Sequence, residues 1–141
     1  MKLSEKIRNA RIARGMSQYE LAQTIGVSGR TIQNYEMGAR MPRNRGTYEA
    51  LATALDVNVD TLLDENASFV LSATEQYGRR GARQAMDMVN DIAAMWAGGE
   101  MEEEDMDAVM HAMQEAYWEA KKNNRKYVNR RASDENTTDG N

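Results

Sequence analysis

Apolar residues recur three and four positions apart along most of the chain, a spacing that predicts helices. The first expected helix spans residues 3–13, where Leu3, Ile7 and Ala10 share one face, and Gly15 ends it. No alternating run of β-branched residues is long enough to form a strand, and the chain has one proline. The pattern therefore predicts an all-α fold.

Capping residues and glycines mark the next two helices. Ser17 and Glu20 have the spacing of a capping box at the start of a second helix, and Gly26 can adopt the left-handed conformation that ends it. Ser28 is expected to cap a third helix, which Gly38 ends. Two short helices joined by a tight turn are therefore expected between residues 17 and 38.

A polar loop at residues 40–46 separates the third helix from the rest of the first domain. The loop contains three arginines, and Thr47 is expected to cap a fourth helix directly after it. Asn58 is expected to cap a short fifth helix. Because these helices supply their own apolar positions, the first domain is expected to span residues 1–65.

The second half of the chain is expected to form a helical hairpin. Residues 66–80 are predicted to be a partly helical connecting segment, and residues 81–128 contain two amphipathic stripes joined by two glycines. Residues 129–141 contain no apolar residue larger than alanine and are expected to be a disordered tail. The apolar positions expected to form a dimer interface are Met86, Val89, Ile92, Trp96, Met106, Val109, Met110, Met113 and Tyr117.

Composition excludes several kinds of site. The absence of cysteine removes disulfides, thiolate metal sites and cysteine nucleophiles, and the single histidine, His111, rules out histidine-cluster metal sites. We therefore expect no metal, no cofactor and no enzyme activity. The sequence shows no secretory signal and no apolar run able to span a bilayer, so a cytoplasmic protein without a membrane partner is expected.

The net charge of −4 is unevenly distributed. Residues 1–49 carry nine lysines and arginines against four acidic residues, whereas residues 66–141 carry nine against fourteen. A locally basic domain suits nucleic-acid binding. The six acidic residues at positions 100–107 favour the positive end of a helix, and a cation site or a DNA mimic is the alternative. The basic segment at residues 121–131 suits either a helix C-terminus or nucleic acid.

The segment SQYELAQTIGVSGRTIQNYEMGARMP has the features that a helix-turn-helix requires. Ala22 allows close approach of the two helices, Gly26 supplies a positive φ in the turn, and Ile32 fills the space between the helices. On these residues, positions 3–64 resemble the Cro/C1-type, or XRE-like, helix-turn-helix family of phage and bacterial repressors. The resemblance implies a five-helix, lambda-repressor-like domain whose third helix lies in the DNA major groove.

The resemblance also implies which side chains contact DNA. Arg30 can pair with guanine, and Gln33 or Asn34 with adenine. Gly29 stands where a long polar side chain is common in the family, so one base contact is expected to be missing. The implied base-reading residues are Gly29, Arg30, Gln33 and Asn34. Residues expected at the DNA backbone or minor groove are Gln18, Ser28, Thr31, Arg40, Arg43 and Arg45.

Two further positions match a structural ion pair of the family, and they are Arg11 and Glu36. The leading hypothesis is a sequence-specific transcriptional regulator, namely a repressor that binds an inverted-repeat operator as a homodimer. One alternative is an antitoxin whose C-terminal helices bind a toxin and which also controls its own promoter. An adaptor that binds proteins but not DNA is the alternative from another class. The expected partners are therefore double-stranded DNA, a second copy of the chain, and a toxin or anti-repressor at the C-terminal helices.

Overall fold

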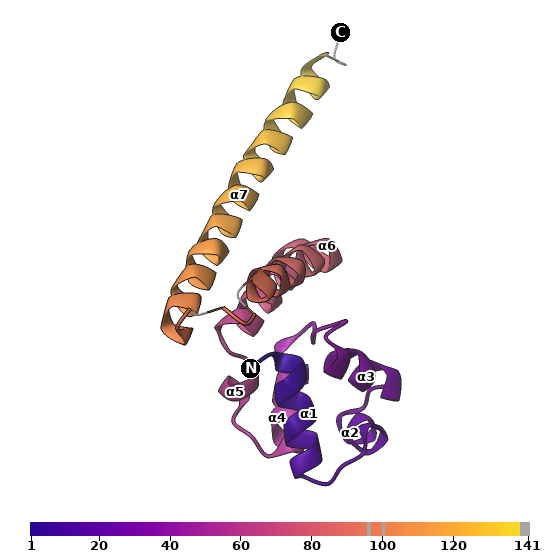
Figure 1. Cartoon of the computed structure of the whole chain (residues 1–141). Helices are drawn as coiled ribbons and strands as arrows, with labels where there is room; N and C mark the ends of the chain where they lie inside the picture. Colours follow the sequence, from indigo (N-terminus) through magenta and orange to yellow (C-terminus); the bar gives the residue numbers. More distant parts are fainter. Residues whose placement is uncertain (96, 100, 139–141) are drawn as a thin grey trace. The chain divides into compact units, whose positions relative to one another are not determined.

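The computed structural model describes the backbone of residues 1–95, 97–99 and 101–138, and the side chains of these residues up to position 123. The described residues contain helices and no strand, which confirms the expected all-α class. The chain divides into an N-terminal unit, residues 1–90, and a C-terminal unit, residues 91–141. The first five helices of the N-terminal unit are α1 (Leu3–Ala13), α2 (Gln18–Ile25), α3 (Gly29–Met37), α4 (Arg45–Leu55) and α5 (Val59–Leu62) (Figure 1).

Local capping explains where α2 and α3 begin and end. The Ser17 hydroxyl accepts a hydrogen bond from the Glu20 N–H at 3.0 Å, which is the forward half of the predicted capping box. Gly26 and Gly38 end the two helices with φ values of 77° and 75°, in the left-handed region that glycine adopts without strain. The predicted bounds of both helices are thus confirmed.

The start of α4 differs from the prediction. Asn44, not Thr47, is the capping residue, because its side-chain oxygen accepts a hydrogen bond from the Thr47 N–H at 2.8 Å. Arg45 therefore lies in the first turn of α4, and not in the preceding loop as expected. Both Asn and Thr are good capping residues, so the helix starts at the first of the two.

The core of the N-terminal unit is formed mainly by residues of the five helices α1 to α5. Its largest members are fully buried aliphatic side chains, each of which stabilises the fold by about 1.5–3 kcal/mol through burial. Ala67 and Leu71, which follow the predicted domain end at residue 65, belong to the same core cluster. The fully buried aliphatic members of α1 to α5 are Ile7, Leu21, Ile32, Leu51, Leu55 and Leu62.

Helix α6 (Glu65–Met95) replaces the partly helical connecting segment and the first hairpin helix. The Asp64 side chain caps it by accepting a hydrogen bond from the Ala67 N–H at 2.9 Å. Gly78 interrupts the helix with non-helical φ and ψ values of 68° and −152°. Consequently α6 consists of two helical segments, the first of which contributes to the core described above.

The C-terminal unit contains the end of α6, a turn and helix α7 (Glu103–Thr138). Gly98 lies in the turn with a φ of 84°, as expected for a glycine that reverses the chain. Residues 129–138, predicted to be a disordered tail, continue α7. Neither proline nor glycine occurs between Gly99 and Gly140, so nothing in this stretch breaks the helix. Positions 139–141 of the predicted tail lie outside the described residues.

Tyr48 on α4 provides a test of the core. Its ring is fully buried, and its hydroxyl has no hydrogen-bond partner among the described residues. Burial raises the pKa of this phenol, and the nearby Asp64 carboxylate and Tyr35 raise it further. A buried hydroxyl without a partner costs about 1–3 kcal/mol, so Tyr48→Phe is expected to increase or preserve the free energy of unfolding in urea titrations.

The pH dependence gives the control for this prediction. An unfolded chain ionises tyrosine near pH 10.0, whereas buried Tyr48 stays neutral, so stability should fall as the pH rises past this value. The fall should be smaller in Tyr48→Phe. If this variant is instead destabilised by more than about 1 kcal/mol, the hydroxyl makes a favourable interaction in the folded protein.

Candidate nucleic-acid interface

Helices α2 and α3 are joined by a tight turn with the features expected of a helix-turn-helix. The N–H of Val27 donates to the carbonyl of Ala22 at 2.9 Å, which closes the end of α2 over Gly26. Ala22 on α2 and Ile32 on α3 are both buried in the same core cluster. The structure therefore gives these small and branched residues the packing roles that the sequence predicted.

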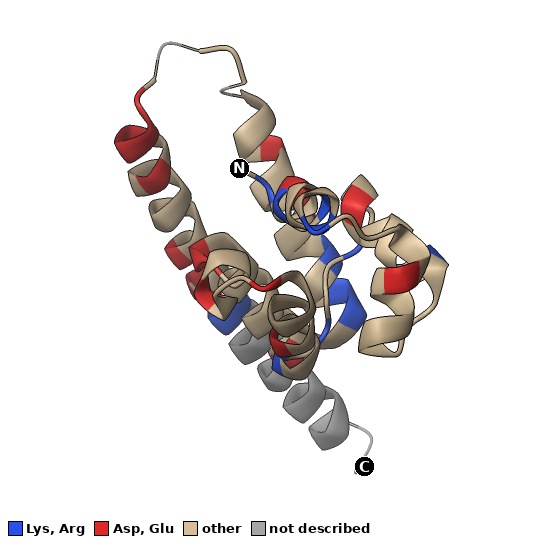
Figure 2. Ribbon diagram, turned by 90° about the horizontal axis from the view of Figure 1, so that it is seen from below, with Lys and Arg blue, Asp and Glu red and all other residues tan. Residues whose placement is uncertain are grey.

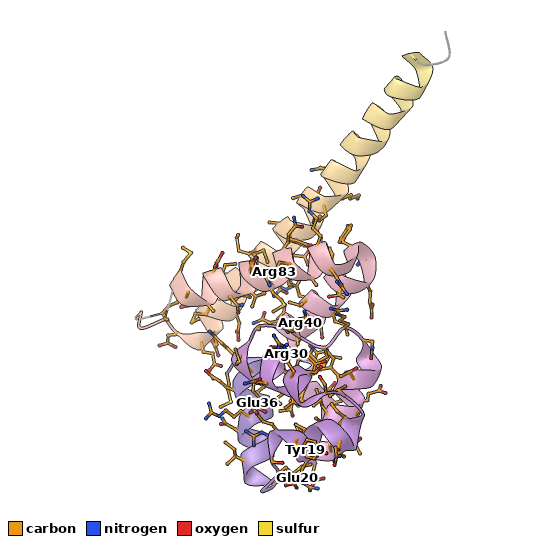
Figure 3. All side chains as sticks on the ribbon, turned by 90° about the vertical axis from the view of Figure 1, so that its right-hand side faces the viewer. Tyr19, Glu20, Arg30, Glu36, Arg40 and Arg83 are labelled. Carbon is orange, nitrogen blue, oxygen red and sulfur yellow. The ribbon has the colours of Figure 1, made fainter. Side chains whose placement is uncertain are left out.

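The outer face of α3 carries the predicted base-reading residues. Arg30 and Gln33 are exposed and lie three positions apart, so they share one face, while Asn34 beside them is half-buried. Ile32 and Tyr35 point into the core from the opposite side. Figure 3 shows the Arg30 side chain on this helix, which lies at an edge of the N-terminal unit (Figure 1). The arrangement leaves two polar side chains and one half-buried amide for contact with a ligand.

Met37 extends this face by one helical turn, and sequence reasoning missed it. It is four residues beyond Gln33, and its side chain is 69% exposed. Gly29 begins the same face, and a Cβ atom there would meet nothing within 4 Å. The missing side chain at Gly29 therefore reflects the sequence and not a lack of space.

The N-termini of α2 and α3 hold the other predicted contacts of the helix-turn-helix. Ser28 caps α3, accepting from the Thr31 N–H at 3.1 Å, and the two hydroxyl oxygens are 2.9 Å apart. Gln18 is half-buried at the first position of α2. Tyr19 beside it, which the sequence analysis did not single out, is 65% exposed, and its hydroxyl accepts from the Gln23 amide at 2.7 Å. Helix N-termini attract anions, so both ends suit phosphate.

An ion pair between α1 and α3 holds α3 in place. The Arg11 guanidinium donates two hydrogen bonds to the Glu36 carboxylate, from Nε at 2.9 Å and from Nη2 at 2.8 Å. Its Nη1 donates to the Met16 carbonyl at 2.8 Å. The two side chains are only 13% and 4% exposed. This is the structural pair that the family resemblance implied, and its bidentate geometry fixes the C-terminal turn of α3.

The loop after α3 places positive charge beside the helix. Arg40 and Arg43 are exposed, and the intervening Pro42 is buried and anchors the loop. Burial raises the pKa of the Tyr35 phenol, while the positive charges of Arg43 and Arg40 act in the opposite direction. Both guanidinium groups are thus close enough to Tyr35 to influence it electrostatically. Figure 3 shows Arg40 and Arg30 in the same view of the unit.

Arg45 is placed differently from the other two loop arginines. Its side chain is on the first turn of α4, where its Nε is 3.3 Å from a carboxylate oxygen of Glu49. Both side chains are more than half exposed, so this pair contributes little to stability. A contact between Arg45 and a DNA backbone stays a prediction.

The predicted dimer-interface residues occupy α6 and α7. Ile92 and Met110 are buried, whereas Met113 is exposed. Trp96 lies outside the described residues. The half-buried members of the set are Met86, Val89, Met106, Val109 and Tyr117. Their role as a dimer interface stays a prediction.

Charges on α7 follow the expectation for a helix start. Glu103, Glu104 and Asp105 lie in its first turn, and acidic residues are visible along the beginning of this helix in Figure 2. In the basic segment at residues 121–131, Lys121 lies over the Tyr117 ring at 5.6 Å, and side chains beyond position 123 are not described. Among the described residues, no three acidic or histidine side chains are grouped so that they could hold a metal ion. No described helix is both long and apolar enough to cross a bilayer.

Comparison with known proteins bears on the N-terminal helices. Residues 7–62 match the model of a protein family described as helix-turn-helix. The match begins within α1 and ends with the last residue of α5, so it includes the turn, the exposed face of α3 and the ion pair. No solved structure matches the chain.

Proposed function

Residues 7–62 belong to the Cro/C1-type helix-turn-helix family of DNA-binding transcriptional regulators, and on this premise we propose that the protein is a dimeric repressor. It binds an inverted-repeat operator, with α3 of each copy in the major groove. The observation that carries the proposal is the outer face of α3, where Arg30 and Gln33 are exposed on a helix held by a partly buried ion pair. Such a regulator has no need of a cofactor or a catalytic group.

Each side chain of the reading face has a chemical role in this proposal. The Arg30 guanidinium donates two hydrogen bonds to O6 and N7 of a guanine. Gln33 or Asn34 pairs with N6 and N7 of an adenine. Thr31 contacts a phosphate or a thymine methyl group, while Ser28 and Gln18 lie at the helix N-termini that face the DNA backbone. Specificity then depends on few side chains, because Gly29 contributes none.

The loop arginines supply affinity without sequence preference. Arg40 and Arg43 follow α3 directly, so a helix in the major groove brings them to the neighbouring phosphates. Positive charge near a narrow minor groove offers a further contact for one of them. Arg45 belongs to the same group, although its pairing with Glu49 must then be exchanged for a phosphate.

Substitutions at Arg30 and Arg43 distinguish a side chain that contacts bases from one that contacts phosphates. Arg30→Ala is expected to relax the preference at one base-pair position and to weaken operator binding by about 1–3 kcal/mol. Arg43→Ala is expected to weaken all sequences alike and to flatten the salt dependence of binding by about one unit. Titrations on operator and on random duplex at several salt concentrations measure both effects.

The matched comparison decides the roles. Both variants remove one exposed arginine, so their overall loss of charge is equal. Equal losses on operator and random duplex for both substitutions would contradict the assignment of Arg30 as a base reader. A protein-binding adaptor would show no preference for any duplex, with or without Arg30.

Antitoxin function is the second candidate, and the surface of the C-terminal unit favours it. Met95 and Met113 expose 74% and 41% of their surface, and flexible methionine side chains suit a groove for another protein. Under this candidate the same α3 controls the promoter, and the C-terminal helices bind a toxin. Sedimentation of the purified chain separates the two: a dimer supports the leading proposal, and a monomer supports a surface reserved for another protein.

A further inference from the structure

We propose that the second segment of α6 carries an accessory phosphate-binding strip formed by Arg79, Arg80 and Arg83. This strip contacts the backbone of duplex DNA that flanks the site read by α3. The inference rests on the proposed DNA-binding function, and it assigns a role to residues that lie outside the matched positions 7–62. The acidic average of residues 66–141 conceals this basic stretch.

The three arginines share one side of the helix. Arg79 and Arg83 are four positions apart, and Arg80 and Arg83 are three apart, so their side chains project together. All three are exposed. Gly81 and Ala85 are buried and lie on the opposite side, since helical positions two apart point about 200° away from each other. The strip therefore faces solvent and makes no contribution to the core.

These arginines do not stabilise the second segment of α6. Gly78 breaks α6, so Arg79 and Arg80 occupy the first turn of the second segment. A cation at a helix N-terminus is unfavourable, whereas an anion there is favourable. The chain carries no acidic residue between Glu75 and Asp87 that would offset this positive charge. Arginines clustered at the start of a helix therefore lower its stability but favour the binding of phosphate.

Ion pairs within the protein do not prevent the three arginines from binding a ligand. Arg83 approaches Asp87 at 3.9 Å, but the side chains are 74% and 63% exposed, and such pairs contribute little. In the part of the chain that the structure describes, neither Arg79 nor Arg80 forms an ion pair. Arginine binds phosphate through paired N–H groups, which favours this ligand over a hydrophobic partner.

The position of α6 in the N-terminal unit connects the strip with the reading helix. Figure 3 shows Arg83, Arg40 and Arg30 in succession along the unit, from α6 through the loop after α3 to α3 itself. In Figure 1, α6 passes above this loop on the same side as α3. Duplex DNA extends beyond a half-site in both directions, so a basic helix beside the loop meets flanking phosphates.

The test compares two lengths of DNA. The full-length chain is titrated with a duplex that ends at the edges of the site it selects from random DNA, and with one that has about ten additional base pairs on each side. Wild-type protein is expected to bind the longer duplex more tightly and with a steeper salt dependence. Arg79→Glu/Arg80→Glu is expected to lose about 10–100-fold on the longer duplex and to change little on the shorter one.

Glutamate is chosen as the replacement because it is not expected to destabilise the folded protein. Acidic residues in a first helical turn are favourable, so this variant is expected to melt no lower than wild type. Arg79→Lys/Arg80→Lys keeps the charge and is the matched control, expected to retain most of the length dependence. A variant that melts lower and loses equal affinity on both duplexes would assign the arginines a structural role and overturn the proposal.

The two-duplex titration distinguishes an error in the proposed role of the three arginines from an error in the proposed DNA-binding function. If wild type prefers its selected site but binds both lengths with equal affinity and salt dependence, the strip makes no DNA contact and the proposed function stands. If wild type shows no preference for any sequence at either length, the proposed function fails, and the accessory role fails with it.

Discussion

Glu36→Ala is expected to lower the free energy of unfolding by about 3–5 kcal/mol, because it leaves the largely desolvated Arg11 guanidinium without its partner. The Glu36 carboxylate is 4% exposed and accepts two hydrogen bonds from Arg11. Since the pair joins α1 to the end of α3, the variant is also expected to weaken operator binding. Urea unfolding followed by circular dichroism measures the change in stability.

A double variant is the control for this prediction. Arg11→Met/Glu36→Leu replaces both charges with apolar groups of similar size and should recover much of the lost stability, since buried pairs often tolerate such replacement. Recovery would show that the single variant suffers from an unpaired charge and not from a cavity. A loss below about 1 kcal/mol in Glu36→Ala would contradict the view that the pair is desolvated.

Removal of the C-terminal unit is expected to reduce operator affinity by about 10²–10⁴-fold while half-site preference persists. A fragment of residues 1–90 contains the whole N-terminal unit and its core. Under the dimer proposal the fragment becomes monomeric, because it lacks most of the predicted interface residues. It loses affinity because a second copy of α3 is no longer held nearby at high effective concentration. Sedimentation and binding titrations on the fragment and the full chain measure the two effects together.

The opposite result would relocate the dimer interface. A fragment that binds the operator at full affinity would place the contact between copies within the N-terminal unit. The C-terminal helices would then be better explained as a surface for a toxin or another protein. A shorter fragment, residues 1–65, is the control for folding, and it should be less stable because it lacks Ala67 and Leu71.

This control also shows what the sequence could not predict. Glycines and capping hydroxyls act on their immediate neighbours, so Ser17, Gly26 and Ser28 were sufficient to place α2 and α3. Asn44 and Thr47 are both capping residues three positions apart, and local pattern alone does not choose between them. Whether residues beyond 65 join the core depends on packing between distant segments, which periodicity does not report.

In the candidate site, too, local features could be predicted from the sequence, whereas features that depend on packing between helices could not. The exposed face of α3 follows from its helical period, which placed Arg30 and Gln33 together. The exposure of Met37 and Tyr19 depends on how neighbouring helices cover them, and no local pattern predicted it. Similarly, the arginines after Gly78 are significant only because the helix breaks there, at a position predicted as part of a connecting segment.

The central claim is that two copies of α3 read an inverted repeat, and selection of bound sequences from a random duplex pool by the full-length chain tests it most directly. We expect enrichment of a two-fold symmetric site whose half-site centres are about one helical turn, 34–36 Å, apart or a multiple of it. Recovery of a single unrepeated sequence, or of no preferred sequence, would contradict it.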